Sequence, residues 1–130
     1  MAKQTTLPAY YLGTDFAYIF EILNEAETAA LDIGGWALSF MVKRDREDSD
    51  AAALITKTTG DGAIVIAGVF DAVPATNQQR ATVTIADSDT DPTDPAMRGT
   101  KWWELKRTDA GLETVLADGT VPFRRGVHHT

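Results

Sequence analysis

Apolar residues in this 130-residue chain recur with a period of two rather than 3.6. The clearest case is segment 36–43, where one face would carry Trp36, Leu38, Phe40 and Val42. Successive side chains of a β-strand point to opposite faces, so this alternation predicts a strand with one strongly apolar face. A chain patterned in this way is expected to fold into sheets rather than into a helical bundle.

Further segments of the same kind are separated by residues typical of turns. The expected strands span 16–22, 36–43, 53–58, 63–70, 80–86, 101–107 and 112–123. Gly60-Asp61-Gly62 predicts a hairpin turn, and the uninterrupted apolar run 63–70 predicts a central strand that is covered on both faces. Pro95 predicts a short helical turn before the penultimate strand. About seven strands at this spacing indicate an all-β fold, an immunoglobulin-like β-sandwich.

The apolar faces of these strands predict the core of the sandwich. Adjacent Trp102 and Trp103 must point to opposite faces, and numbering parity places Trp103 inside with Leu105. Asp118-Gly119 predicts a bend or bulge in the last strand. The expected core residues are Phe16, Tyr18, Phe20, Trp36, Leu38, Phe40, Val65, Val83, Ile85, Trp103 and Leu105.

Composition excludes several classes of partner. With 12 basic and 19 acidic residues the net charge is -7, which disfavours a nucleic-acid partner because phosphate binding needs clustered cations. The chain has no cysteine, and therefore no disulfide, thiolate nucleophile or cysteine zinc site. No apolar run approaches the roughly 18 residues of a membrane helix, so no membrane partner is expected.

The residues that could carry chemistry do not form a recognisable site. The loop Asp87–Asp94 begins like a calcium loop, but Pro92 and Arg98 occupy the positions that need glycine and glutamate. Turn and helix capping is the favoured interpretation, and ion binding by this loop stays open. His128 and His129 are the only histidines and no serine lies in a nucleophile elbow. No catalytic residue, metal or cofactor is therefore expected.

The remaining candidates are aromatic residues that a core does not need. Tyr10, Tyr11 and Trp102 are candidates for a protein interface, where tyrosine and tryptophan are enriched. Their rings could instead stack on sugars. The expected organisation is an N-terminal arm 1–12, one β-sandwich domain 13–125 and a tail 126–130.

The order of the segments also resembles a known family. The residues that carry the resemblance are Gly13-Thr14-Asp15-Phe16, the segments 31–44 and 82–87, and Gly99-Thr100-Lys101-Trp102-Trp103-Glu104-Leu105. In these the chain resembles the immunoglobulin-like N-terminal domains of siphophage baseplate upper proteins. The resemblance implies a non-enzymatic structural protein of a tailed-phage virion, located in the tail, baseplate, neck or capsid decoration. Its partners would be other virion proteins, in a homo-oligomer, ring or lattice. The alternative is a carbohydrate-binding module for adsorption to the host surface.

Overall fold

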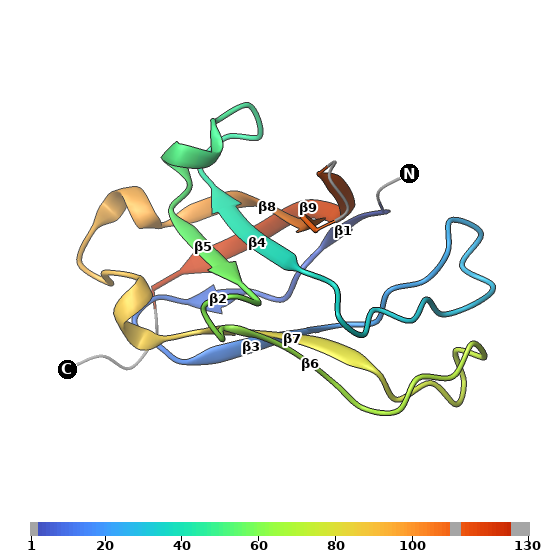
Figure 1. The fold of residues 1–130 in the computed structure, drawn as a ribbon. Coiled ribbons are helices and arrows are strands. Elements are labelled where there is room, and N and C mark those ends of the chain that lie inside the picture. The colour runs from blue at the N-terminus through green and yellow to red at the C-terminus, as the bar shows by residue number, and fades with distance from the viewer. Residues whose placement is uncertain (1–2, 110–112, 126–130) are drawn as a thin grey trace.

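A computed structural model describes residues 3–109 and 113–125 and shows an all-β protein with two sheets (Figure 1). The larger sheet has the order β1-β9-β8-β4-β5, with β2 also paired to β9, and the smaller sheet has the order β3-β7-β6. The strands are β1 Lys3–Thr6, β2 Tyr10–Tyr11, β3 Phe16–Phe20, β4 Leu38–Lys43, β5 Ile55–Thr58, β6 Ile64–Ala67, β7 Arg80–Ile85, β8 Gly99–Arg107 and β9 Thr114–Arg124. The helical content of the described residues is limited to the short 3-10 turns η1 Asp50–Ala52, η2 Asp87–Asp89 and η3 Pro95–Met97.

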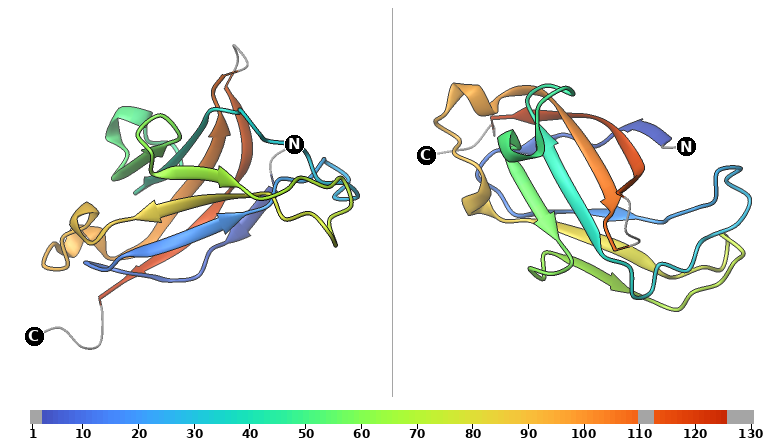
Figure 2. Two further views of the ribbon diagram at one scale, coloured as in Figure 1. Left: turned by 60° about the horizontal axis from the view of Figure 1, so that its bottom comes forward. Right: turned by 45° about the horizontal axis from the view of Figure 1, so that its top comes forward.

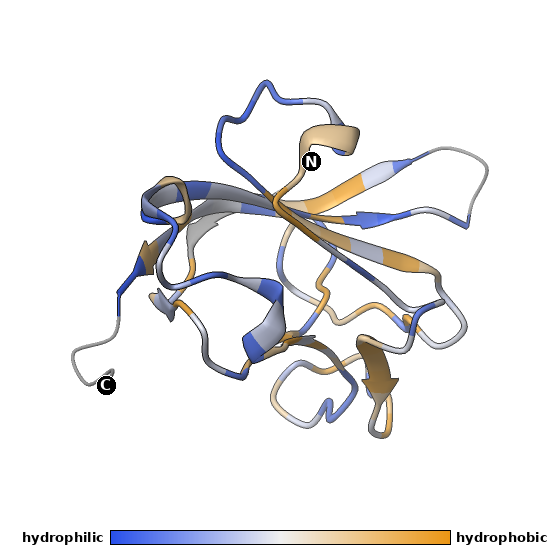
Figure 3. Ribbon diagram, turned by 90° about the vertical axis from the view of Figure 1, so that its left-hand side faces the viewer, coloured by the Kyte–Doolittle hydropathy of each residue, from blue (hydrophilic) through white to orange (hydrophobic). Residues whose placement is uncertain are grey.

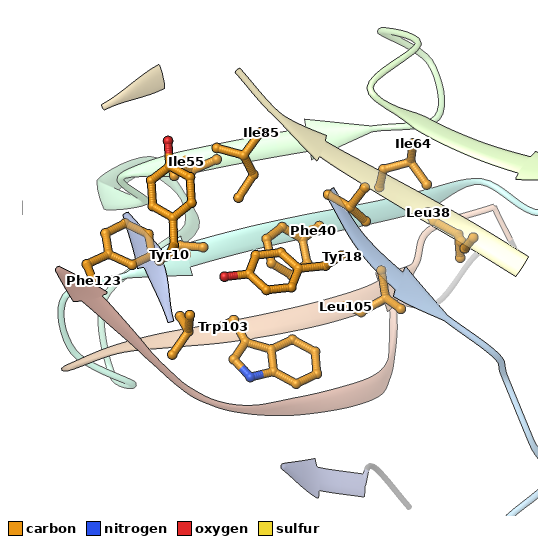
Figure 4. Close-up of a cluster of buried hydrophobic side chains, with 14 of the residues drawn as sticks. Tyr10, Tyr18, Leu38, Phe40, Ile55, Ile64, Ile85, Trp103, Leu105 and Phe123 are labelled. Atoms are coloured by element: carbon orange, nitrogen blue, oxygen red, sulfur yellow. The ribbon is translucent and has the colours of Figure 1, made fainter. Parts of the chain in front are cut away.

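The two sheets enclose one apolar core, whose centre is a group of aromatic rings (Figure 4). Phe40 of β4 has its ring centroid 6.0 Å from that of Trp103 on β8 and 6.1 Å from that of Phe20 on β3. The Phe20 and Trp103 rings are 5.5 Å apart, so both sheets contribute to the group. Figure 3 shows the alternation that makes this possible, with hydrophobic and hydrophilic residues following one another along the strands. The period-two pattern therefore places one side of each strand in the core.

Most of the expected core residues lie in this interior. Phe20 and Trp36 are partly buried and pack against the core, and the buried ones are Tyr18, Leu38, Phe40, Val83, Ile85, Trp103 and Leu105. The prediction is wrong for Phe16 and Val65, which are 40% and 54% exposed. Phe16 is the first residue of an edge strand, with only β7 beside it. Val65 points to the outer face of the smaller sheet, opposite to its buried neighbour Ile64.

The segment around β6 differs from its prediction because periodicity cannot show which strands pair. Of the run 63–70, only Ile64–Ala67 form a strand, β6, which is paired only with β7 among the described strands and so lies at an edge rather than at the centre of a sheet. The turn Gly60-Asp61-Gly62 does not close a hairpin, because β5 pairs with β4 in the larger sheet and β6 pairs with β7 in the smaller one. Gly62 has φ +83°, which suits glycine, but the turn links the two sheets.

Residues 3–12 are part of the larger sheet, which corrects their assignment to an arm outside the domain. Both β1 and β2 run parallel to β9, with Lys3 opposite Ala117 and Tyr10 opposite Phe123. Tyr10 is fully buried, so the prediction that it belongs to an exposed interface is wrong. Its ring lies 5.1 Å from that of Phe123, and its hydroxyl donates to the backbone oxygen of Thr14 at 2.7 Å.

The long hairpin β8–β9 contains the expected irregularity at a different place. Leu105 pairs with Ala117 and Lys106 pairs with Val115, so Leu116 is the extra residue of a β-bulge. Asp118 and Gly119 instead stay in register, opposite Glu104 and Trp103. The helical turn expected around Pro95 is present as η3, with the Asp94 carboxylate accepting a hydrogen bond from the backbone N–H of Ala96.

Candidate interaction surface

The outer face of the larger sheet holds a network of charges whose role is to satisfy two buried lysines. Lys43 Nζ lies 2.9 Å from Asp50 Oδ1 and 3.1 Å from Glu104 Oε1. Lys106 Nζ lies 3.0 Å from both Asp50 Oδ2 and Glu113 Oε2. Buried ammonium groups need such partners, because an unpaired buried charge costs several kcal/mol. The turn η1 thus covers this part of the sheet through Asp50.

The pKa values of this network favour its charged form. Hydrogen bonds from Lys43 and Lys106 hold the pKa of the Asp50 carboxyl below its usual value. Burial by itself would lower the pKa of Lys43, but hydrogen bonds to Asp50 and Glu104 outweigh it and raise this pKa above the ordinary value. Asp50 therefore favours its carboxylate form and Lys43 its ammonium form, as an ion pair requires. The network joins η1 to strands β4 and β8.

Elsewhere in the fold, Lys101 and Tyr18 also have perturbed pKa values. Burial lowers the pKa of Lys101, whose ammonium donates to the backbone oxygens of Ala96 at 3.0 Å and Arg98 at 2.8 Å. Burial raises the pKa of the Tyr18 hydroxyl, which donates to the backbone oxygen of Pro8 at 2.9 Å. Each of these groups ties a loop to the sheets.

The acidic loop 87–94 uses its carboxylates within the protein. Asp89 accepts a hydrogen bond from the backbone N–H of Ala86 at 2.7 Å and pairs with Lys57 at 2.6 Å. Asp91 accepts from the Thr93 hydroxyl at 2.6 Å. Within residues 3–109 and 113–125, no three histidine, aspartate or glutamate side chains gather in a way that could hold a metal ion. His128 and His129 lie outside the described residues.

Trp102 lies in a small hollow on the outer face of the larger sheet. The guanidinium of Arg46 lies 5.7 Å from the centre of its ring, within the range of a cation–π interaction. The hollow measures about 170 Å³, and its polar lining includes Glu47, Glu104 and Asp118. Trp102 is partly buried, so only part of its ring is accessible to a partner. Tyr11, by contrast, is exposed on β2.

A larger groove of about 590 Å³ opens where the end of β3 approaches the start of β9. Its apolar lining comes from residues such as Phe20, Leu31 and Leu116, and acidic residues stand beside them. One of these, Glu21, is 3.4 Å from the guanidinium of Arg80. The groove is therefore an apolar hollow with acidic residues at its side.

A row of exposed apolar residues lies on the outer face of the smaller sheet, whose three strands run side by side in Figure 2. Ile19 of β3 and Val65 of β6 both pair with Thr82 of the central strand β7, so the three residues form one row across the sheet. Ile19 is 64% exposed and Val65 is 54% exposed. Val69, in the loop after β6, is 74% exposed. Sequence reasoning missed this surface because it assigned the run 63–70 to the interior.

Comparison with family models and with curated proteins finds no relative of this chain. In the part of the chain that the structure describes, no helix is long and apolar enough to cross a membrane. The candidate surface therefore has to be interpreted from its own residues.

Proposed function

We propose that the two-sheet fold is an immunoglobulin-like β-sandwich. In that fold one sheet carries strands G, F and C, to which variable-type domains add C′, and the other carries B, E and D beside strand A. If β3 to β9 are taken as B, C, C′, D, E, F and G, the two observed orders are G-F-C-C′ and B-E-D. The B–F disulfide has no counterpart, and Phe20, Phe40 and Trp103 join strands B, C and F by ring contacts instead.

On this fold, the function we propose is non-enzymatic assembly into a virion of the tailed-phage type, alongside other virion proteins. The observation that supports it best is the exposed apolar row of Ile19 and Val65 on the smaller sheet, together with the exposed Val69 in the loop after β6. Isolated exposed apolar residues are common, but side chains gathered on one sheet face indicate a contact surface. The buried ammonium groups of Lys43, Lys101 and Lys106 have partners within the chain, which favours a structural role over a catalytic one.

Incorporation into particles tests this proposal. The chain is expressed together with its neighbouring genes, and purified particles are analysed by quantitative mass spectrometry. The wild-type chain should be present at a fixed copy number per particle. Val65→Lys places a charge in the proposed contact and should reduce incorporation at least about tenfold, which corresponds to about 1.4 kcal/mol. Val65→Thr keeps the β-branched shape and serves as the control. Absence of the wild-type chain from particles would refute the assembly role.

A carbohydrate-binding module is the second candidate, and the hollow beside Trp102 is the observation that favours it. An aromatic ring next to carboxylates can stack on a sugar and accept its hydroxyl hydrogen bonds. Here the ring is partly occupied by Arg46. Titration with oligosaccharides from a host cell wall should then shift the tryptophan emission of the wild-type protein but not that of Trp102→Phe. An unchanged emission spectrum would remove this candidate.

A further inference from the structure

Strand β6 presents one complete free edge to solvent, and the direction of its backbone groups follows from its pairing with β7. Val65 pairs with Thr82, and the backbone N–H of Thr84 donates to the oxygen of Ala63 at 3.0 Å. In an antiparallel ladder, bonded residues alternate with residues whose backbone groups point the other way. The N–H and C=O groups of Ile64 and Ile66 therefore point away from β7. No strand of the described residues pairs with that edge.

This edge lacks the protection that β5, an edge strand of the larger sheet, has. Natural sheets protect an edge with charged residues, inward-pointing lysines, prolines or a covering loop. The edge strand β5 carries the lysine Lys57, which is largely buried and reaches Asp89 in the loop after β7. From Ala63 to Phe70, in contrast, there is no charged residue and no proline. An unprotected edge of β-branched residues is the surface that a further strand adds to.

The charges at the two ends of this edge determine what kind of strand fits. Asp61 precedes β6 and Asp71 follows it, and both are exposed. β6 spans only Ile64–Ala67, with Asp61 in the turn before it and Asp71 in the loop after it. A second copy would bring the same two acidic residues to this edge in either orientation. Like charges brought together along a strand pair are destabilising, so the ends disfavour a second copy.

We propose that β6 is a strand-addition site for an extended segment of a different protein, apolar and β-branched in its centre and basic at both ends. The added strand would extend the smaller sheet from three strands to four, and its backbone would pair with Ile64 and Ile66. Its basic ends would meet Asp61 and Asp71. This inference rests on the proposed assembly function and names the chemistry of the partner that the surface accepts.

A peptide-binding experiment tests the inference on the full chain. The probe is fluorescein-labelled Lys-Arg-Val-Thr-Val-Thr-Val-Arg-Lys, and its counterpart is Glu-Asp-Val-Thr-Val-Thr-Val-Asp-Glu, both followed by fluorescence anisotropy. The basic peptide should bind at least about tenfold more tightly than the acidic one at low ionic strength, where charges are least screened. Ile66→Pro removes an outward N–H without breaking the ladder to β7 and should abolish binding.

Matched variants separate strand addition from simple attraction to an acidic protein. Ala17→Pro removes an outward N–H on β3, the other edge of the same sheet, and should leave binding unchanged. The pair Asp61→Asn and Asp71→Asn keeps the side-chain oxygens that cap the two turns and should reduce the preference for the basic peptide below about threefold. Circular dichroism verifies that each variant is folded.

Several outcomes would overturn the inference. These are the absence of binding by both peptides, binding that Ile66→Pro leaves intact, and a dimer of the protein alone that Ile66→Pro dissociates in sedimentation velocity. The last result would make a second copy the occupant. If peptide binding fails while Val65→Lys still blocks incorporation into particles, assembly stands and only the strand-addition site is refuted.

Discussion

Replacing Phe40 by alanine measures how much the aromatic centre contributes to stability. Phe40 is fully buried, and its ring lies 6.0–6.1 Å from those of Tyr18, Phe20 and Trp103. Burial of such a side chain contributes roughly 1.5–3 kcal/mol. The enclosed position prevents collapse, so a cavity adds about 24 cal/mol per Å³ of lost volume. Together these effects predict a loss of about 4 kcal/mol in the free energy of unfolding.

The matched control is Phe16→Ala, which removes the same ring from a position that the sequence pattern treats as equivalent. Phe16 is 40% exposed, and its ring meets that of Tyr18 edge-on, with the two ring centroids 4.9 Å apart. No closed cavity forms there, so the loss should be only about 1–2 kcal/mol. Urea unfolding followed by tryptophan fluorescence gives both values. Equal losses for the two variants, within about 1 kcal/mol, would refute the assignment of Phe40 to the centre and of Phe16 to the margin.

Three further predictions concern backbone strain and pH. Gly68 has φ +99°, and a Cβ atom there would collide with the backbone oxygen of Gln78. Gly68→Ala should therefore lower the free energy of unfolding in urea by at least about 2 kcal/mol, whereas the control Gly60→Ala should lower it by less than about 1 kcal/mol. The pKa of Asp50 is lowered in the folded state, so its carboxylate stabilises the fold above the unfolded pKa of about 3.9, and this stabilisation is lost as the pH falls through the folded pKa. The urea midpoint of Asp50→Asn should therefore depend less on pH in acid than that of the wild type. The pKa of Tyr18 is raised in the folded state, so the free energy of unfolding should fall as the pH rises above the unfolded pKa of about 10. This fall should be smaller for Tyr18→Phe, which lacks the hydroxyl.

Local patterns predicted the strands well because burial on one face leaves a period-two signature in the sequence. Segment 36–43 reads as an alternating strand and forms β4, and the parity argument for the adjacent tryptophans places Trp103 in the core. Parity also places Trp102 outside the interior. The contact of its ring with Arg46 could not be predicted, because Arg46 lies in a loop whose position no local pattern shows. The capping of η3 by Asp94 follows from a local hydrogen bond and is equally visible in sequence.

A local sequence pattern does not show which strands pair with each other. The wrong predictions all concern features that depend on this pairing. Residues 3–12 look like an arm because their strands are short and polar, yet β9 offers them an edge and buries Tyr10 against Phe123. The run 63–70 looks interior because every residue is small or apolar. Only the assignment of β5 and β6 to different sheets leaves Val65 and the edge of β6 in solvent.

The sequence by itself therefore determined an all-β chain without cysteine, with about seven of its strands and most of its core, because these depend on composition and on the alternation of side chains along each strand. The tertiary structure alone decided the order of strands in each sheet, the incorporation of residues 3–12 and the position of the exposed surface. Those features depend on which distant backbone groups meet. An apolar strand has the same sequence signature at the centre of a sheet and at its edge, and only its neighbours distinguish core from contact surface.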